Sequence, residues 1–226
     1  MSTRSILVSS SISRHEGLEP LPCTWQTALL WTLRAVLMLT IVAETLSGDY
    51  LWAADALLAL ALCSLPSALF RNYDRASTLN IEIVFLAMAV GNCTLGVAGN
   101  LYRSLPYYDK VLHIINPAAL AYCSFVFMWT IVSTRDTGIS PLALAAVTTL
   151  MVLGASAIWE LAEYVSDQLA STSTQGSPLL APLDDTMWDL LLSFFGGLLG
   201  AVAAALSVLS SRHNAHTQRE GKGWLS

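Results

Sequence analysis

Three short stretches of the sequence bring carboxylate and imidazole groups together at helical spacing. Within each stretch these groups lie three or four residues apart, which places them on one face of a helix. The stretches are Tyr108-Asp-Lys-Val-Leu-His113, Trp159-Glu-Leu-Ala-Glu-Tyr164 and Asp184-Asp-Thr-Met-Trp-Asp189. Carboxylates and an imidazole can ligate a metal ion, act as general acids and bases, or relay protons in a transporter.

The composition predicts a membrane protein. Hydrophobic residues make up 54% of the 226 residues, charged residues make up 12%, and the mean hydropathy is +0.57. Soluble domains carry about 25% charged residues. The net charge of −5, without a local cluster of Lys or Arg, argues against nucleic acid as a partner. Because ionisable groups are costly in a bilayer, we expect a function for four of them, His113, Glu160, Glu163 and Asp189.

The apolar segments predict an all-α, polytopic membrane helix bundle. Six segments are long enough to cross about 30 Å of hydrocarbon. They cover residues 25–46, 51–70, 80–102, 109–132, 141–165 and 185–210. This divides the chain into a polar N-terminal arm (1–24), a six-helix transmembrane domain (25–210) and a polar tail (211–226).

The distribution of Lys and Arg predicts the orientation. With a cytoplasmic N-terminus, eight of these residues lie on the cytoplasmic side and two, Arg103 and Lys110, lie on the other. We therefore expect a multi-pass protein of the inner or plasma membrane. Both termini, including the polar tail, are expected to be cytoplasmic. In this topology the three acidic stretches meet at one depth near the extracytoplasmic face. The loop at 171–182 joins two of them and is expected to lie over the site as a lid.

The cluster has the composition of a divalent metal site. In this interpretation Asp109, His113, Glu163 and Asp189 are the metal ligands. Glu160 and Asp185 act as acid–base groups or orient the ligands. Carboxylates with one imidazole suit Mg²⁺, Mn²⁺, Fe²⁺ or Zn²⁺, and the identity of the metal stays open.

Other polar residues have simpler explanations. Asp184 favours the start of a helix, and Asp49 lies in a tight turn. Glu82 is expected to reach the membrane interface, and Arg34 to make a structural link between helices. The four cysteines are far apart, without a CxxC motif, and no role is expected for them.

The order of the motifs resembles that of a known family. Asp109-Lys-Val-Leu-His113, Trp159-Glu-Leu-Ala-Glu163, and Asp185-Thr-Met-Trp-Asp189 before Phe194-Phe-Gly-Gly-Leu-Leu-Gly200 are similar to motifs of the bacterial inner-membrane YjdF-like family, whose function is unknown. The similarity to the VanZ-like family, associated with glycopeptide resistance, is looser. The resemblance covers residues 102–200 and implies a shared polar site without an established reaction. A Gln-Gly-Asp of the YjdF-like pattern is interrupted here, because Gln175-Gly176 is followed by Ser177-Pro178.

The leading hypothesis is a metal-dependent membrane enzyme, either a hydrolase or a transferase. Its substrate is a lipid or a lipid-linked molecule, and membrane lipids surround the protein as partners. One alternative is a small proton-coupled transporter or permeability factor that uses the same carboxylates as a relay. Another is a structural protein that binds a partner in the membrane. The sequence lacks an HExxH motif, a phosphate-binding glycine-rich loop and a nucleophile elbow, which leaves serine-based catalysis without support.

Overall fold

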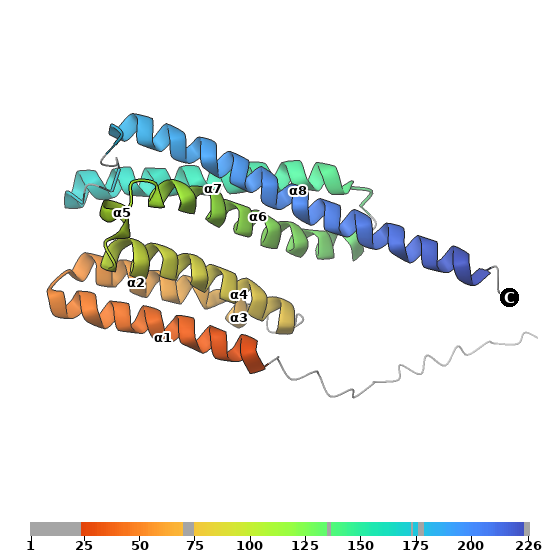
Figure 1. The fold of residues 1–226 in the computed structure, drawn as a ribbon, viewed down its shortest axis with the longest axis horizontal. Coiled ribbons are helices and arrows are strands. Elements are labelled where there is room, and N and C mark those ends of the chain that lie inside the picture. The colour runs from red at the N-terminus through yellow and green to blue at the C-terminus, as the bar shows by residue number, and fades with distance from the viewer. Residues whose placement is uncertain (1–23, 70–74, 135–136, 173, 176–178, 224–226) are drawn as a thin grey trace, which may run out of the picture.

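The computed structural model describes residues 24–69, 75–134, 137–172, 174–175 and 179–223. These residues form a bundle of helices without strands, and six helical segments are long and apolar enough to span a membrane (Figure 1). They cover Trp25–Ser47, Tyr50–Ala68, Thr78–Ala98, Tyr108–Thr134, Pro141–Ala170 and Pro182–Ser211. The predicted all-α bundle with six spans is confirmed. The N-terminal arm lies outside the described residues.

The first three spans pack together as one group. They comprise α1 (Thr24–Ser47), α2 (Tyr50–Cys63) with the short α3 (Leu65–Leu69), and α4 (Arg75–Ala89) continued by the π-helix η1 (Val90–Ala98). Their core contains Leu30 and Leu37 from α1, Ala56 from α2 and Leu86 from α4. In a bilayer such packing relies on close contact and not on exclusion of water, which suits these alanines and leucines.

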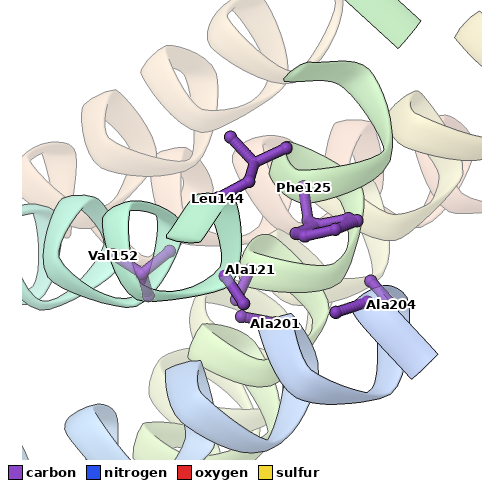
Figure 2. Packing of buried hydrophobic residues seen from close by; sticks show 8 residues of the cluster. Ala121, Phe125, Leu144, Val152, Ala201 and Ala204 are labelled. Carbon is purple, nitrogen blue, oxygen red and sulfur yellow. The ribbon is translucent and has the colours of Figure 1, made fainter. Parts of the chain in front are cut away.

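The last three spans form a second group. After the short α5 (Leu101–Ser104), the chain forms α6 (Tyr108–Thr134), α7 (Pro141–Ala170) and α8 (Pro182–Gly223). Figure 2 shows their apolar core, to which α6 contributes Ala121 and Phe125 and the other two helices contribute Leu144, Val152, Ala201 and Ala204. The two groups meet where α4, η1 and α5 pack against α6.

Helix α8 is longer than predicted. The last span was expected to end at residue 210, but α8 continues to Gly223 through the first part of the polar tail. No glycine or proline interrupts residues 201–220, so the sequence holds no strong signal that stops the helix earlier.

The third span is less regular than predicted. It was expected to run from residue 80 to 102, but it starts in α4 at Arg75, becomes a π-helix at Val90 and ends at Ala98. Asn100 then adopts a left-handed conformation (φ 57°), which asparagine tolerates better than most residues. Gly96 lies against the ring of Tyr102, where a Cβ atom would collide with the ring. The break therefore places Tyr102 beside the π-helix.

Two glycines bring α6 and α8 into close contact. A Cβ atom at Gly196 would collide with the carbonyl oxygen of Ile114, and one at Gly200 with that of Ala118. We expect Gly196→Ala to destabilise the protein by about 1–3 kcal/mol, because the helices must separate. Thermal melting in detergent measures this. Gly154→Ala in α7 is the matched control, since open space surrounds that position. Equal melting temperatures of the two variants would contradict the proposed contact.

Glu82 does not reach the membrane interface as predicted. It is fully buried and accepts hydrogen bonds from Arg34 of α1 and from Ser67 of α3. Arg34 also lies over the ring of Trp31, 5.0 Å from its centroid. The prediction for Glu82 failed because it considered α4 alone, whereas α1 carries the matching cation at the same depth.

Candidate functional site

The three acidic stretches meet at one end of the bundle. The start of α6, the end of α7 and the start of α8 lie together at the left in Figure 1, together with α5 and the turn between α1 and α2. The predicted convergence of the three stretches at one depth is therefore present in the structure. The side of the membrane that this end faces remains a prediction.

Lys110 is at the centre of the cluster. Its Nζ atom donates to Asp185 Oδ1 at 2.7 Å, to both carboxylate oxygens of Asp189 at 2.7 Å, and to Asp109 Oδ2 at 3.0 Å. The side chains of Asp185 and Asp189 are almost fully buried. One ammonium group thus links α6 to the first two turns of α8.

His113 is held from both sides of its ring. Its Nδ1 atom lies 3.2 Å from the hydroxyl oxygen of Ser193, which is fully buried. Its Nε2 atom faces three carboxylates, at 3.5 Å from Asp109 Oδ1, 3.7 Å from Glu160 Oε1 and 4.0 Å from Asp189 Oδ1. If Nδ1 donates its proton to Ser193, the lone pair of Nε2 points at the carboxylates and is available to a cation.

The geometry fits a small cation. One ligand atom each from Asp109, His113 and Asp189 lies within 4.8 Å of the other two. Glu160 is only 4% exposed, and within the described chain its Oε1 atom has no hydrogen-bond partner. A buried carboxylate oxygen that accepts no hydrogen bond is costly. The carboxyl groups of these residues and Asp185 outnumber the one ammonium and one imidazole, so the cluster carries excess negative charge unless it binds protons or a cation.

Glu163 lies apart from the other predicted ligands. Its Oε1 atom accepts a hydrogen bond from Trp159 Nε1 at 2.8 Å, and its side chain lines a neighbouring cavity. The structure thus brings together three of the four predicted metal ligands, and it places Glu163 on the wall beside them. Of the two predicted acid–base residues, Glu160 faces His113 and Asp185 binds Lys110.

Two cavities adjoin the cluster. A polar cavity of about 960 Å³ opens at this end of the bundle, and Asp109, Glu163 and Asp185 form part of its wall. An apolar cavity of about 430 Å³ lies deeper, between the two helix groups, and His113 forms part of its wall. The two cavities share four lining residues, Asp55, Asn92, Tyr102 and Trp159. Ligand pockets of proteins typically measure about 300–1,000 Å³.

The loop after α7 is fixed at the polar cavity. Asp167 accepts hydrogen bonds from the backbone N–H groups of Thr174 and Gln175, at 2.6 and 2.9 Å, and from the hydroxyl of Thr172 at 2.5 Å. The amide of Gln175 donates to Thr186 of α8 at 3.2 Å. Thr172 and Thr174 line the cavity, which agrees with a loop over the site. Residues 173 and 176–178, and with them Gly176 of the Gln-Gly pair, lie outside the described chain.

Sequence reasoning missed Lys110 and Ser193. Lys110 entered only as a loop charge that set the orientation, although its neighbours Asp109 and His113 were assigned to the site. Ser193 continues the row Asp185, Asp189 at intervals of four, so the same periodicity indicated it.

Replacing Ser193 by Ala is expected to weaken binding of added Mn²⁺ by about 10–100-fold, because the residue that orients a ligating histidine is lost. Electron paramagnetic resonance of free Mn²⁺ measures the affinity, and melting of the metal-free protein reports on folding. Ser207→Ala is the matched control, because the hydroxyl of Ser207 donates to the Ala204 carbonyl oxygen of its own helix and Ser207 lies outside the cluster. Unchanged affinity in the folded Ser193 variant would rule out the orienting role.

Comparison with known proteins places the chain in a family. The model of the family described as predicted membrane protein (DUF2238) matches residues 26–210. No curated protein and no solved structure gives a significant match. The match covers all six spans and the three acidic stretches. The chain belongs to the DUF2238 family of predicted membrane proteins.

Proposed function

We propose that this protein is a metal-dependent membrane enzyme that acts on a lipid or a lipid-linked substrate. The observation that carries the proposal is the excess of buried carboxyl groups around His113, with Glu160 Oε1 lacking a hydrogen-bond partner in the described chain. A divalent cation at this point would neutralise the excess charge and give that oxygen a partner.

The residues have distinct proposed roles. Asp109, His113 and Asp189 hold the cation, and Ser193 orients the imidazole. Glu160 lies next to them and serves as the acid–base group, while Asp185 keeps Lys110 in place. Glu163 contacts the substrate or completes the coordination from the cavity wall. When bound, the metal supplies a Lewis acid for a carbonyl or phosphoryl group. Carboxylate and imidazole donors fit Mg²⁺, Mn²⁺, Fe²⁺ or Zn²⁺.

The substrate enters from the membrane in this proposal. The cluster lies between a polar cavity at the membrane end and an apolar cavity within the bundle. A lipid-linked molecule can present its polar part to the cluster while its chain stays in apolar surroundings. Hydrolysis or transfer of a phosphoryl group is the reaction that a divalent metal at such a boundary would support.

A proton-coupled transporter is the weaker alternative. A relay would need ionisable groups that continue toward the other end of the bundle, and Glu82 of α4 is an acidic residue in that direction. Its two carboxylate oxygens accept from Arg34 and Ser67, so Glu82 is bound in a structural pair.

The DUF2238 match can be compared with the resemblance of the sequence motifs to the YjdF-like and VanZ-like families. It supports a YjdF-like membership, and the more distant VanZ-like similarity remains a proposal that rests on the motifs alone.

Lipid analysis of a strain that lacks the protein tests the function. We expect one lipid class to accumulate, to return to normal with the wild-type protein, and to remain elevated with Glu160→Gln. Asp184→Asn is the matched control, because Asp184 is an exposed residue in the first turn of α8. An unchanged lipid profile in the deletion strain, or full complementation by Glu160→Gln, would contradict the enzyme proposal.

A further inference from the structure

The apolar cavity has the form of a binding site for a hydrocarbon chain. Its wall is built by both helix groups, with Leu58 and Leu62 from α2, Phe85 and Met88 from α4, and Leu120 from α6. Along α2 the lining runs from Asp55 to Cys63, which are eight helical steps or about 12 Å apart. The cavity therefore extends over more than a third of the hydrocarbon thickness, which is about 30 Å.

The cavity is accessible from the bilayer. Leu58 and Leu62 are 57% and 53% exposed, so the apolar lining continues onto the outer surface of the bundle. Among the described residues, no Cα atom of α2 lies within 8 Å of a Cα atom of α6 or α7, and the cavity lies between these helices. In a membrane the molecules at this surface are lipid chains.

The polar cavity sets the chemistry of the head group. Among the residues that the structure describes, its wall carries six acidic residues, Glu44, Asp49, Asp55, Asp109, Glu163 and Asp185, and one basic residue, Arg103. The acidic residues outnumber Arg103 and the Lys110 ammonium group that contacts Asp109 and Asp185, so the wall attracts a cationic group. Asp55, which lines both cavities, lies where the head and chain of a bound lipid would join.

We propose that these joined cavities bind a membrane lipid with an amine head group, its ammonium group in the polar cavity and one acyl chain in the apolar cavity. The inference rests on the proposed function, since it names the substrate class of the same site. The head group then lies beside Asp109 and Glu163, and the chain passes His113. Phosphatidylethanolamine has this chemistry, whereas phosphatidylglycerol has the same chains and phosphate without the amine.

Photocrosslinking in lipid nanodiscs tests the proposal. The probes are phosphatidylethanolamine and phosphatidylglycerol with the same diazirine-bearing acyl chain, and mass spectrometry maps the labelled peptides. We expect labelling at Phe85, Met88 and Leu120. Phosphatidylethanolamine should be labelled preferentially by roughly tenfold, because one charge-assisted hydrogen bond contributes enough free energy for that ratio. Asp55→Asn should reduce this preference.

Two alanines of α2 provide matched variants. Ala59 lines the apolar cavity, and Ala61 is exposed outside it. Ala59→Phe should abolish the labelling in the cavity, and Ala61→Phe should leave it unchanged. Absence of labelling at the cavity residues would overturn the chain site, and equal labelling by both lipids would overturn the preference for an amine.

Repeating the experiment with EDTA and with Mn²⁺ separates this inference from the proposed function. If the protein is labelled selectively in EDTA and does not bind added Mn²⁺, the lipid site is supported and the metal-dependent enzyme is contradicted. A protein that binds metal but shows no selective labelling would retain the metal site and lose the lipid inference.

Discussion

Replacing Lys110 by Met should raise the affinity of the protein for Mn²⁺ at least tenfold. The ammonium group of Lys110 contacts both oxygens of Asp189, a member of the cation site, and also Asp109. It therefore competes with a bound cation for the same carboxylates. Two unit charges about 4 Å apart interact by about 4 kcal/mol at an effective dielectric constant of 20, and a tenfold change in affinity requires only about 1.4 kcal/mol.

Without metal, the Lys110→Met variant should have a lower melting temperature than the wild type, and added Mn²⁺ should raise it by more. Without the ammonium group, Asp185 and Asp189 are left buried beside each other's negative charge. Added Mn²⁺ should recover the lost stability, so the metal-induced rise in melting temperature should exceed that of the wild type. Arg103→Met is the control, because Arg103 is an exposed cation at the same end of the bundle. If Lys110→Met weakens Mn²⁺ binding, Lys110 supports the cation site instead of competing for it.

Removing the contact between the partly buried Arg34 and the fully buried Glu82 should destabilise the protein by about 3–5 kcal/mol. Glu82 is fully buried, and removing Arg34 leaves its charge without a partner. Arg34→Met and Glu82→Gln should each show this loss in denaturant unfolding in detergent.

The double variant Arg34→Met with Glu82→Gln is the decisive control for this pair. It removes both charges, so much of the stability lost in either single variant should return. If the double variant loses as much stability as the two single variants together, the two residues act independently. A relay role for Glu82 would then be open again.

The membrane fold could be predicted from the sequence because hydropathy and length alone define spans. The same spans placed the acidic stretches at one end, which is why Asp109, His113 and Asp189 could be grouped although α7 separates them in the chain. The π-helix and the left-handed Asn100 were not predicted from the sequence, and they place the Tyr102 ring against Gly96.

The details of the site required knowledge of helix rotation. Residues three apart on a helix differ by about 60° in direction at 3.6 residues per turn. Glu160 therefore faces His113, while Glu163 faces the polar cavity and Trp159. The sequence placed both on one face, and only the packing of α7 against α6 and α8 distinguishes them. Lys110 was missed because charge counting treated it as a loop residue, whereas its long side chain reaches α8.

The metal content of the detergent-purified protein, determined by elemental mass spectrometry, tests the central claim most directly. The wild-type protein should carry about one divalent ion per chain. The double variant His113→Ala/Asp189→Asn should carry none, and Asp184→Asn should retain the ion. Absence of metal in the wild type, with no change in melting temperature on addition of Mg²⁺, Mn²⁺, Fe²⁺ or Zn²⁺, would contradict the metal-dependent enzyme.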